Sequence, residues 1–389
     1  MSEWKNCILG EFVESISTTY KFQPNEEVIF LNTSDIFLGN VLNKNPENSA
    51  KLPGQAKKRI QKGDFLFSEI RPANGRYAFI NFDAEKYVVS TKLMVLRCNS
   101  NINVDFFRLF LTSKENLDYL QMLAEDRSGT FPQITFDHIS SLEISLPPLP
   151  EQTAIASILS SLDDKIDLLH RQNATLEKMA ETLFRQWFVE EAKEENKMGK
   201  ISDYAFHFKK SIQPQKHQSI IFHHYSIPSF DNGKEPLIEV GNEIQSNKYQ
   251  VKENCILFSK LNPHKDKRVW LIQNENKSNS ICSTEFQVIL PKKKEYLYFL
   301  YGWLTLFENY NEIASGIGGT SGSHQRIDPN TIFNFQCPIF EDSFFNKINI
   351  QIEPIFKKQL SNQSQIRTLT ALRDTLLPKL MSGEVRVEY

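Results

Sequence analysis

The sequence contains an internal repeat with a period of about 190 residues, which is the size of a domain. Three segments recur in the same order at offsets of 191 to 193: Leu66–Pro72 as Leu257–Pro263, Ser90–Leu93 as Ser283–Phe286, and Ser128–Ile134 as Ser321–Ile327. A weaker match, Val28–Leu31 with Pro236–Glu239, precedes them. Four matches in one order, three of them at a near-constant offset, predict two similar domains.

Each copy mixes strand-like and helix-like segments. Short runs rich in aromatic and β-branched residues, separated by turn signals such as Asn74-Gly75, predict strands: Phe65–Phe67, Tyr87–Leu96 and Leu142–Leu146, then Ile256–Phe258, Glu285–Leu290 and Phe333–Cys337. Apolar segments of helical character lie between them at Phe106–Leu123 and Tyr296–Ile313. The predicted fold class is α+β, with an antiparallel or mixed sheet in each domain.

Each copy ends in a segment with the 4-3 apolar spacing of a coiled-coil helix. The first, Ile155–Trp187, follows the proline-rich stretch Leu146–Gln152 and would be roughly 50 Å long at 1.5 Å per residue. The second, Ile348–Leu380, is more polar. Pro354 predicts that its regular helix begins near that residue, and Pro378 predicts a kink or an end.

Two arrangements of these helices are open: each packs on its own domain, or the two pair with each other as antiparallel partners. Asn173 and Asn362 lie near the middle of the two seams, and facing amides would set the register of a pair. The pairing hypothesis places these residues at the contact: Leu159, Leu162, Ile166, Leu169, Asn173, Leu176, Ile355, Asn362, Ile366, Leu369 and Leu376. The expected organisation is a first domain over 1–149, a helix over 150–197, a second domain over 198–345 and a helix over 346–389.

The formal net charge of −2 conceals local charge of opposite sign. Lys51–Arg76 carries an excess of five positive charges and Lys260–Lys277 an excess of three, whereas Glu151–Met198 has an excess of four negative charges. The five cysteines are scattered without metal or disulfide spacing. No apolar run reaches the roughly 20 residues of a membrane helix, and there is no signal-peptide pattern, so we expect a cytoplasmic protein.

Catalytic motifs are missing from the sequence, and polar recognition residues remain. We find no P-loop, dinucleotide fingerprint, amino-methyltransferase tetrapeptide or metal-spaced histidine cluster. Loops at matching places in both copies carry Arg, Lys, Asn, Gln and Ser, which can donate to phosphates and base edges. Although an ordinary solvated loop is the alternative for any one residue, the loops as groups predict DNA contact through these residues: Arg71, Asn74, Arg76, Lys92, Arg127, Ser128, Thr130, Gln133, Lys260, Asn262, His264, Lys265, Lys267, Arg268, Ser321, Ser323, His324, Gln325 and Arg326.

Four motifs carry a family resemblance: Leu146–Gln152 (LPPLPEQ), Leu159–Ile166 (LSSLDDKI), Leu176–Phe188 and Leu376–Val385 (LLPKLMSGEV). The first three resemble the central conserved region of type I restriction–modification specificity subunits, and the fourth is similar to the family's C-terminal region. Ile227–Lys234 (IPSFDNGK) is similar to the opening of some second recognition domains. Phe340–Asn346 departs from the pattern, because it lacks the Pro-Pro-x-x-Glu-Gln start of the first helix.

The resemblance implies a non-catalytic subunit with two target recognition domains, each reading half of a split double-stranded DNA site. It implies that an antiparallel coiled coil sets the spacing of the halves. It also implies modification subunits that use S-adenosylmethionine, which the repeat suggests are two, and restriction subunits that use ATP with Mg²⁺. Two other classes stay open: a coiled-coil scaffold that binds only proteins, and, more weakly, a self-contained nuclease or methyltransferase.

Overall fold

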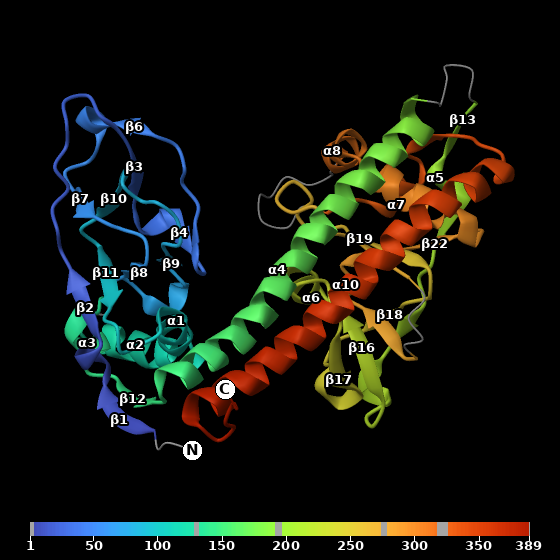
Figure 1. The fold of residues 1–389 in the computed structure, drawn as a ribbon. Coiled ribbons are helices and arrows are strands. Elements are labelled where there is room, and N and C mark those ends of the chain that lie inside the picture. The colour runs from blue at the N-terminus through green and yellow to red at the C-terminus, as the bar shows by residue number, and fades with distance from the viewer. Residues whose placement is uncertain (1–3, 128–131, 191–196, 274–277, 317–325, 389) are drawn as a thin grey trace. The chain divides into compact units, whose positions relative to one another are not determined.

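The computed structural model describes residues 4–127, 132–190, 197–273, 278–316 and 326–388. The chain divides into two compact units, which we describe separately: unit 1 is Met1–Leu169 with Ser364–Tyr389, and unit 2 is His170–Gln363 (Figure 1). Two long helices, α4 (Leu149–Phe184) and α10 (Asp342–Ser382), contribute to both units. Within the described residues, no helix is long and apolar enough to cross a membrane.

In the described residues of unit 1, strands and the helices α1, α2 and α3 accompany the first part of α4. Its elements are β1 (Lys5–Ile8), β2 (Val13–Ile16), β3 (Glu27–Leu31), β4 (Ile36–Phe37), β5 (Asn40–Val41), β6 (Glu47–Asn48), β7 (Ala56–Arg59), β8 (Phe65–Ser68), β9 (Tyr77–Phe79), β10 (Tyr87–Ser90), β11 (Leu93–Cys98), α1 (Val104–Leu111), α2 (Lys114–Arg127), α3 (Phe136–Ser140) and β12 (Glu143–Leu146).

Unit 2 repeats this plan with the second set of elements. They are β13 (Met198–Lys200), α5 (Ile201–Tyr204), β14 (Ala205–His207), β15 (Ser211–Ile212), β16 (Ile221–Tyr225), α6 (Ile227–Asp231), β17 (Leu237–Val240), β18 (Lys248–Gln250), β19 (Cys255–Ser259), β20 (Val269–Ile272), β21 (Ser280–Cys282), β22 (Phe286–Pro291), α7 (Leu297–Thr305), α8 (Phe307–Ser315), α9 (Pro329–Phe333) and β23 (Gln336–Pro338).

The sheet topologies of the two units share a common plan, although unit 2 has a fifth strand, β15, in one main sheet and the β4–β5 pair is found in unit 1. The antiparallel sheet β2-β11-β8-β9 of unit 1 corresponds to β14-β22-β19-β20 of unit 2. The other main sheet of each unit contains one parallel pair, β3 with β10 and β16 with β21, and β7 and β18 run antiparallel to β10 and β21. The predicted α+β class, the mixed sheets and the internal repeat are therefore confirmed.

The two long helices pack against each other in antiparallel fashion within each unit. In unit 1, Asp163 of α4 contacts Arg373 of α10, and Glu151 in the first turn of α4 contacts Arg386, which follows α10. In unit 2, Asn362 Nδ2 donates a hydrogen bond to Asn173 Oδ1 at 3.0 Å. The two amides that the sequence singled out thus face each other, and all eleven residues of the pairing hypothesis are buried or half-buried.

Apolar packing determines where α10 begins, and the expectation that its regular helix starts near Pro354 is wrong. The helix starts at Asp342, twelve residues before Pro354, and continues past Pro378 to Ser382. Phe345, Ile348 and Ile352 are at most 1% exposed in the core of unit 2. Burial of each such side chain is worth roughly 1.5–3 kcal/mol, which together outweighs the roughly 3 kcal/mol cost of an interior proline.

Two smaller boundaries also differ from the sequence-based expectation. Phe333 ends helix α9, and the last strand of unit 2 begins only at Gln336. Asp328 accepts a hydrogen bond from Asn330 N at 2.7 Å, and Pro329 takes the first helical position. This Asp-Pro helix start favours a helical turn over the strand that the aromatic residues suggested.

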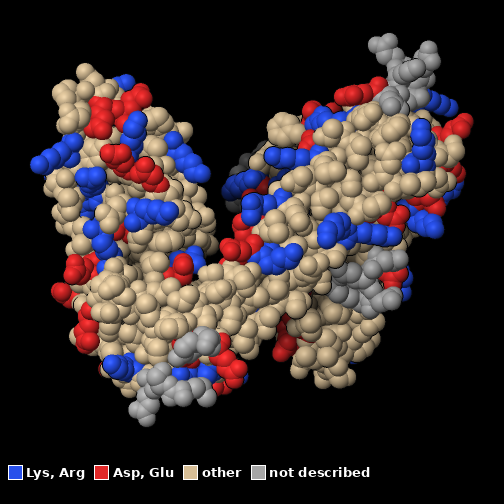
Figure 2. All heavy atoms as spheres, in the orientation of Figure 1, with Lys and Arg blue, Asp and Glu red and all other residues tan. Residues whose placement is uncertain are grey.

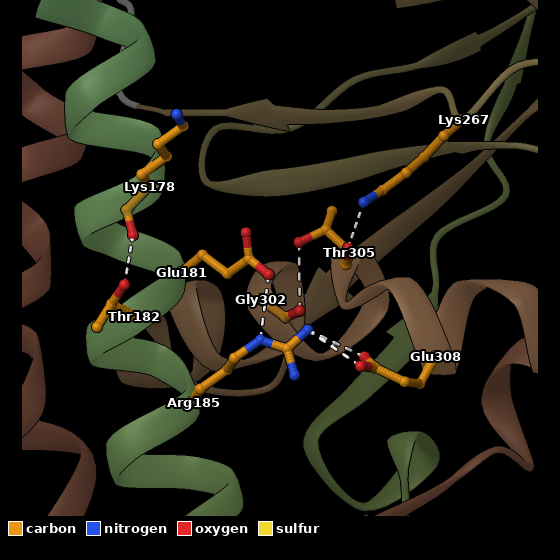
Figure 3. A network of polar contacts seen from close by, with 8 residues as sticks. All are labelled: Lys178, Glu181, Thr182, Arg185, Lys267, Gly302, Thr305 and Glu308. Carbon is orange, nitrogen blue, oxygen red and sulfur yellow. Dashed lines mark hydrogen bonds and ion pairs between the residues drawn. The ribbon is translucent and has the colours of Figure 1, made fainter.

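Close packing and a polar network fasten the end of α4 to the domain of unit 2 (Figure 3). Arg185 donates to Glu181 on its own helix at 3.1 Å and to both oxygens of Glu308 on α8 at 3.1 and 3.2 Å. Gly302 of α7 lies against the Phe184 ring, where an added Cβ would lie 2.3 Å from ring atoms. A side chain at position 302 would therefore push the two helices apart.

Candidate nucleic-acid interface

The first predicted loop of unit 1 is a tight turn with a left-handed residue at its start. Arg71 has φ of 46° and precedes a short 3-10 helix, Pro72–Asn74, which Gly75 ends with φ of 67°. The Arg71 carbonyl accepts from Asn74 N at 2.9 Å. The side chains of Arg71 and Asn74 are exposed, so this turn presents a guanidinium and an amide to solvent.

Arg76, in the same turn, has a structural role in the fold. Its Nη1 donates to the carbonyls of Ser34 and Ile36 at 3.3 and 3.2 Å. The guanidinium also lies over the Phe37 ring, 5.3 Å from its centroid. Arg76 therefore fastens the β4–β5 hairpin beside the turn, and its hydrogen-bonding capacity is partly used within the protein.

Sequence reasoning missed the tip of this hairpin as a surface feature. Phe37, Leu38 and Leu42 are 42%, 54% and 57% exposed. Leu38 has φ of 44°, and its N–H donates to the Gly75 carbonyl at 2.8 Å. The available signal was an apolar pair on each side of the turn residues Gly39-Asn40, in an otherwise polar stretch.

The equivalent turn of unit 2 has the same backbone form and different side chains. Asn262 has φ of 47°, precedes Pro263, and its carbonyl accepts from Lys265 N at 3.0 Å. His264 and Lys265 are exposed, whereas Lys260 and Asn262 are half-buried. The two copies therefore bring donors of different geometry to the same place in their folds.

Two cations of this second turn are held by internal partners. Arg268 donates to Asp231 at 2.7 and 2.8 Å, pairs with Asp266 at 2.8 Å, and keeps a side chain only 11% exposed. The Lys267 ammonium donates to the Thr305 carbonyl (Figure 3), and burial lowers the pKa of Lys267. Both side chains help to hold the turn in shape.

In each unit, an isolated β-bridge joins the two predicted loops. Ile70 pairs with Gln133 in unit 1, and Leu261 pairs with Arg326 in unit 2. Arg326 is also held by Glu285 at 2.8 and 3.0 Å. At the position equivalent to Glu285, unit 1 has the exposed Lys92.

Part of the predicted interface lies outside the described residues. This applies to Ser128, Thr130, Ser321, Ser323, His324 and Gln325, and to the side chain of Arg127 at the end of α2. On the face that Figure 2 shows, basic side chains alternate with acidic and neutral ones. Some of these cations have internal partners. Among the turn residues described above, Arg71, Lys92 and Lys265 remain available to an external ligand.

Neither metal coordination nor a reactive thiol stands out in the parts of the chain that the structure describes. No group of three or more His, Cys, Asp or Glu side chains could hold a metal ion there. Burial raises the pKa of the Cys98, Cys255 and Cys337 thiols to about 12. These cysteines therefore stay protonated and serve as apolar packing groups.

Comparisons with known proteins agree on one family. Residues 1–178 match the family model described as the type I restriction modification DNA specificity domain. The type I restriction enzyme HindI specificity subunit of Haemophilus influenzae is 49% identical over 191 residues, which are 49% of this chain and 42% of that protein. The type I restriction enzyme MjaIX specificity subunit of Methanocaldococcus jannaschii is 29% identical over 309 residues, 72% of this chain and 69% of that protein. The chain thus matches less than half the length of the first relative.

A solved structure shares the fold over nearly the whole chain. The S subunit of a type I restriction–modification system from M. genitalium superposes with a TM-score of 0.61, at 14% identity, covering 97% of this chain and 96% of that one. At this identity the similarity concerns the fold alone. It extends over both units, whereas the family model covers only the first 178 residues.

Proposed function

We propose that this chain, which is similar to the specificity subunits of type I restriction–modification systems, is the DNA-reading, non-catalytic subunit of such a system. In this proposal each unit contacts one half of a split site on double-stranded DNA. The observation that carries it is the family match of residues 1–178, together with the repetition of the same turn-and-bridge geometry in unit 2.

The available side chains are of two kinds: some suit contacts to DNA phosphates, which position the protein, and others suit contacts to bases, which read the sequence. Lys92 and Lys265 are exposed ammonium groups, which suit phosphate oxygens. Arg71 and Asn262 have planar donor groups, and such groups can bind a purine edge with two hydrogen bonds. Both kinds of residue lie on rigid turns whose backbones are hydrogen-bonded to neighbouring strands.

In this proposal, partner proteins catalyse the methylation and the cleavage of DNA. Modification subunits would supply methyl transfer with S-adenosylmethionine, and restriction subunits would supply ATP- and Mg²⁺-dependent cleavage. The repeat provides two similar docking regions and therefore favours two modification subunits. The helix pair formed by α4 and α10 presents apolar side chains such as Met179 and Leu372, which are 49% and 44% exposed, and it is the candidate docking element.

The test is a gel-shift titration of the full chain, assembled with its modification subunits, against duplex DNA over a range of salt concentrations. Each phosphate contact releases a counterion, so the logarithm of affinity should fall linearly with the logarithm of salt, with a slope of about −0.9 per contact. A bipartite sequence preference should persist at high salt. A scaffold that binds only proteins would give neither the slope nor the preference, and that result would overturn the proposal.

A further inference from the structure

Arg71 and Asn262 occupy the same place in two matching backbone frames. Both residues have a left-handed backbone conformation, with φ of 46° and 47°, and both precede a proline. A residue before proline normally takes an extended backbone, and a left-handed conformation is costly for a side chain other than glycine or asparagine. The fold therefore holds a left-handed residue before proline at the same point in both domains, and the cost is greater for Arg71 than for Asn262.

Matched backbone hydrogen bonds hold each frame. In unit 1, Glu69 N donates to the Lys92 carbonyl at 3.2 Å and Ile134 N donates to the Glu69 carbonyl at 2.9 Å. In unit 2 the equivalent bonds run from Lys260 N to Glu285 O at 3.0 Å and from Ile327 N to Lys260 O at 3.1 Å.

A serine hydroxyl completes each frame on the strand side. Ser68 Oγ accepts from Ile70 N at 3.1 Å, and Ser259 Oγ accepts from Leu261 N at 3.3 Å. Each serine is at most 2% exposed. Arg71 and Asn262 thus each lie on a turn that is hydrogen-bonded both to the preceding strand and to neighbouring loops. These hydrogen bonds fix the direction in which the side chain leaves the backbone.

The two side chains remain available for an external partner. Within the described part of the chain, neither the Arg71 guanidinium nor the Asn262 amide forms a hydrogen bond or ion pair. In contrast, Arg76, Arg268 and Arg326 are bound to internal carbonyls or carboxylates. Strain that is retained at a rigid, unengaged position is typical of a functional site.

We propose that positions 71 and 262 are the equivalent base-reading positions of the two units, with Arg71 selecting guanine and Asn262 selecting adenine. The inference rests on the proposed DNA-reading function and deepens it. An arginine guanidinium can donate two hydrogen bonds to O6 and N7 of guanine. An asparagine amide can donate to N7 and accept from the N6 amino group of adenine.

The test exchanges the two residues. The full chain, assembled with its modification subunits, is used to select duplexes from a randomised library, and the wild type is compared with Arg71→Asn and Asn262→Arg. Arg71→Asn should change a single base pair in one half-site from G·C to A·T, and Asn262→Arg should make the reverse change in the other half. Each preference should be about tenfold to a hundredfold. Each substitution puts in one unit the residue that the other unit already accommodates, so folding should be preserved.

Alanine variants separate base reading from phosphate binding. Arg71→Ala should leave one base pair undetermined and keep the rest of the half-site. Lys265→Ala, the matched control, should weaken binding of all sequences alike and leave the motif unchanged. If Arg71→Ala behaves like Lys265→Ala, or if the exchanges leave both half-sites unchanged, the base-reading assignment is wrong. If the wild type selects no bipartite motif, the proposed function itself fails.

Discussion

The starts of the two long helices lie at equivalent positions in the repeat, and they are anchored by different chemistry. In unit 1, Glu151 in the first turn of α4 is buried, with a side chain 1% exposed. It accepts two hydrogen bonds from Arg386 at 2.6 and 2.8 Å and one from the Trp4 indole at 3.2 Å. One carboxylate thus ties together the N-terminal segment, the start of α4 and the segment after α10.

In unit 2 the corresponding acid is Asp342, at the first position of α10. It accepts from the Tyr296 hydroxyl at 2.6 Å and from the Lys293 ammonium, but its side chain is 54% exposed. Both acids lie in a first helical turn, where a negative charge is favourable. The repeat thus keeps an acidic side chain at this position, whereas the burial of that side chain decides how much stability depends on it.

The largest expected effect is the loss of the buried acid. Glu151→Gln removes the charge that compensates Arg386, and we expect unit 1 to lose about 2–3 kcal/mol, because hydrogen bonds to charged groups contribute strongly when they are shielded from water. Hydrogen exchange of peptides from α1 and β8 would measure the change. Asp342→Asn is the matched control and should leave exchange in unit 2 almost unchanged, since water can replace the lost contacts. Equal effects in the two units would contradict the comparison.

The same carboxylate predicts a specific acid sensitivity. Hydrogen bonds from Arg386 hold the pKa of Glu151 below its ordinary value of 4.5. Because the pKa is lower in the folded state, the stability that it contributes is fully present above pH 4.5 and is lost as pH falls below that value. Calorimetric melting of the wild type should show this loss for unit 1. The slope of melting temperature against pH should be shallower in Glu151→Gln. An unchanged slope would exclude Glu151 as the source of the acid sensitivity.

A smaller effect is expected where the helices pair. In unit 2, Asn362 is fully buried and donates to Asn173, whereas in unit 1 the pair of Asp163 and Arg373 is about one-third exposed. Asn362→Ala should cost unit 2 about 1–2 kcal/mol. Asp163→Asn should cost unit 1 less than about 1 kcal/mol, as exposed ion pairs do. A double-mutant cycle with Asn173→Ala would measure the coupling of the amides, and a coupling near zero would show that the facing pair does not stabilise the helix contact.

The turns that we propose to contact DNA differ in charge at one matched position, and this difference should appear in the salt dependence of DNA binding. Lys92 of unit 1 corresponds to Glu285 of unit 2, which neutralises Arg326. Lys92→Ala should therefore reduce the salt slope of DNA binding by about one. Glu285→Gln should release Arg326 and steepen the slope. Titrations of both variants against one duplex would test this. If the salt slope changed in the same direction in both variants, the two positions would not be equivalent on DNA.

Much of the fold could be predicted from sequence, because it depends on periodic apolar patterns and on the repeat. The matches at Leu66–Pro72 and Leu257–Pro263 coincide with the strand-to-turn frames, and the 4-3 spacing located both long helices. The start of α10 could not be predicted, since Pro354 is a local signal, whereas the burial of Phe345 and Ile348 is a tertiary one.

The candidate interface was predictable as a set of loops and less so residue by residue. Arg268 and Arg326 look like free cations in the sequence, but Asp231 and Glu285, which hold them, lie 37 and 41 residues away. Asp266, the second partner of Arg268, is close to it in sequence. Sequence patterns also gave no sign of the left-handed backbone at Arg71, because arginine rarely adopts it. These contacts depend on tertiary folding, which brings separate strands and turns together.

The smallest expected effect concerns that backbone strain. Asparagine enters the left-handed region more readily than arginine, whose cost there is roughly 1–2 kcal/mol, so Arg71→Asn should stabilise unit 1 by up to about 1 kcal/mol. Asn262→Arg should destabilise unit 2 to a similar extent. Calorimetric melting would measure both, with Lys92→Ala as a nearby exposed change that leaves the turn intact. Destabilisation by Arg71→Asn would show that the guanidinium supports the fold. A gain in stability accompanied by an altered base preference would mean that unit 1 retains an unfavourable residue because of what that residue reads.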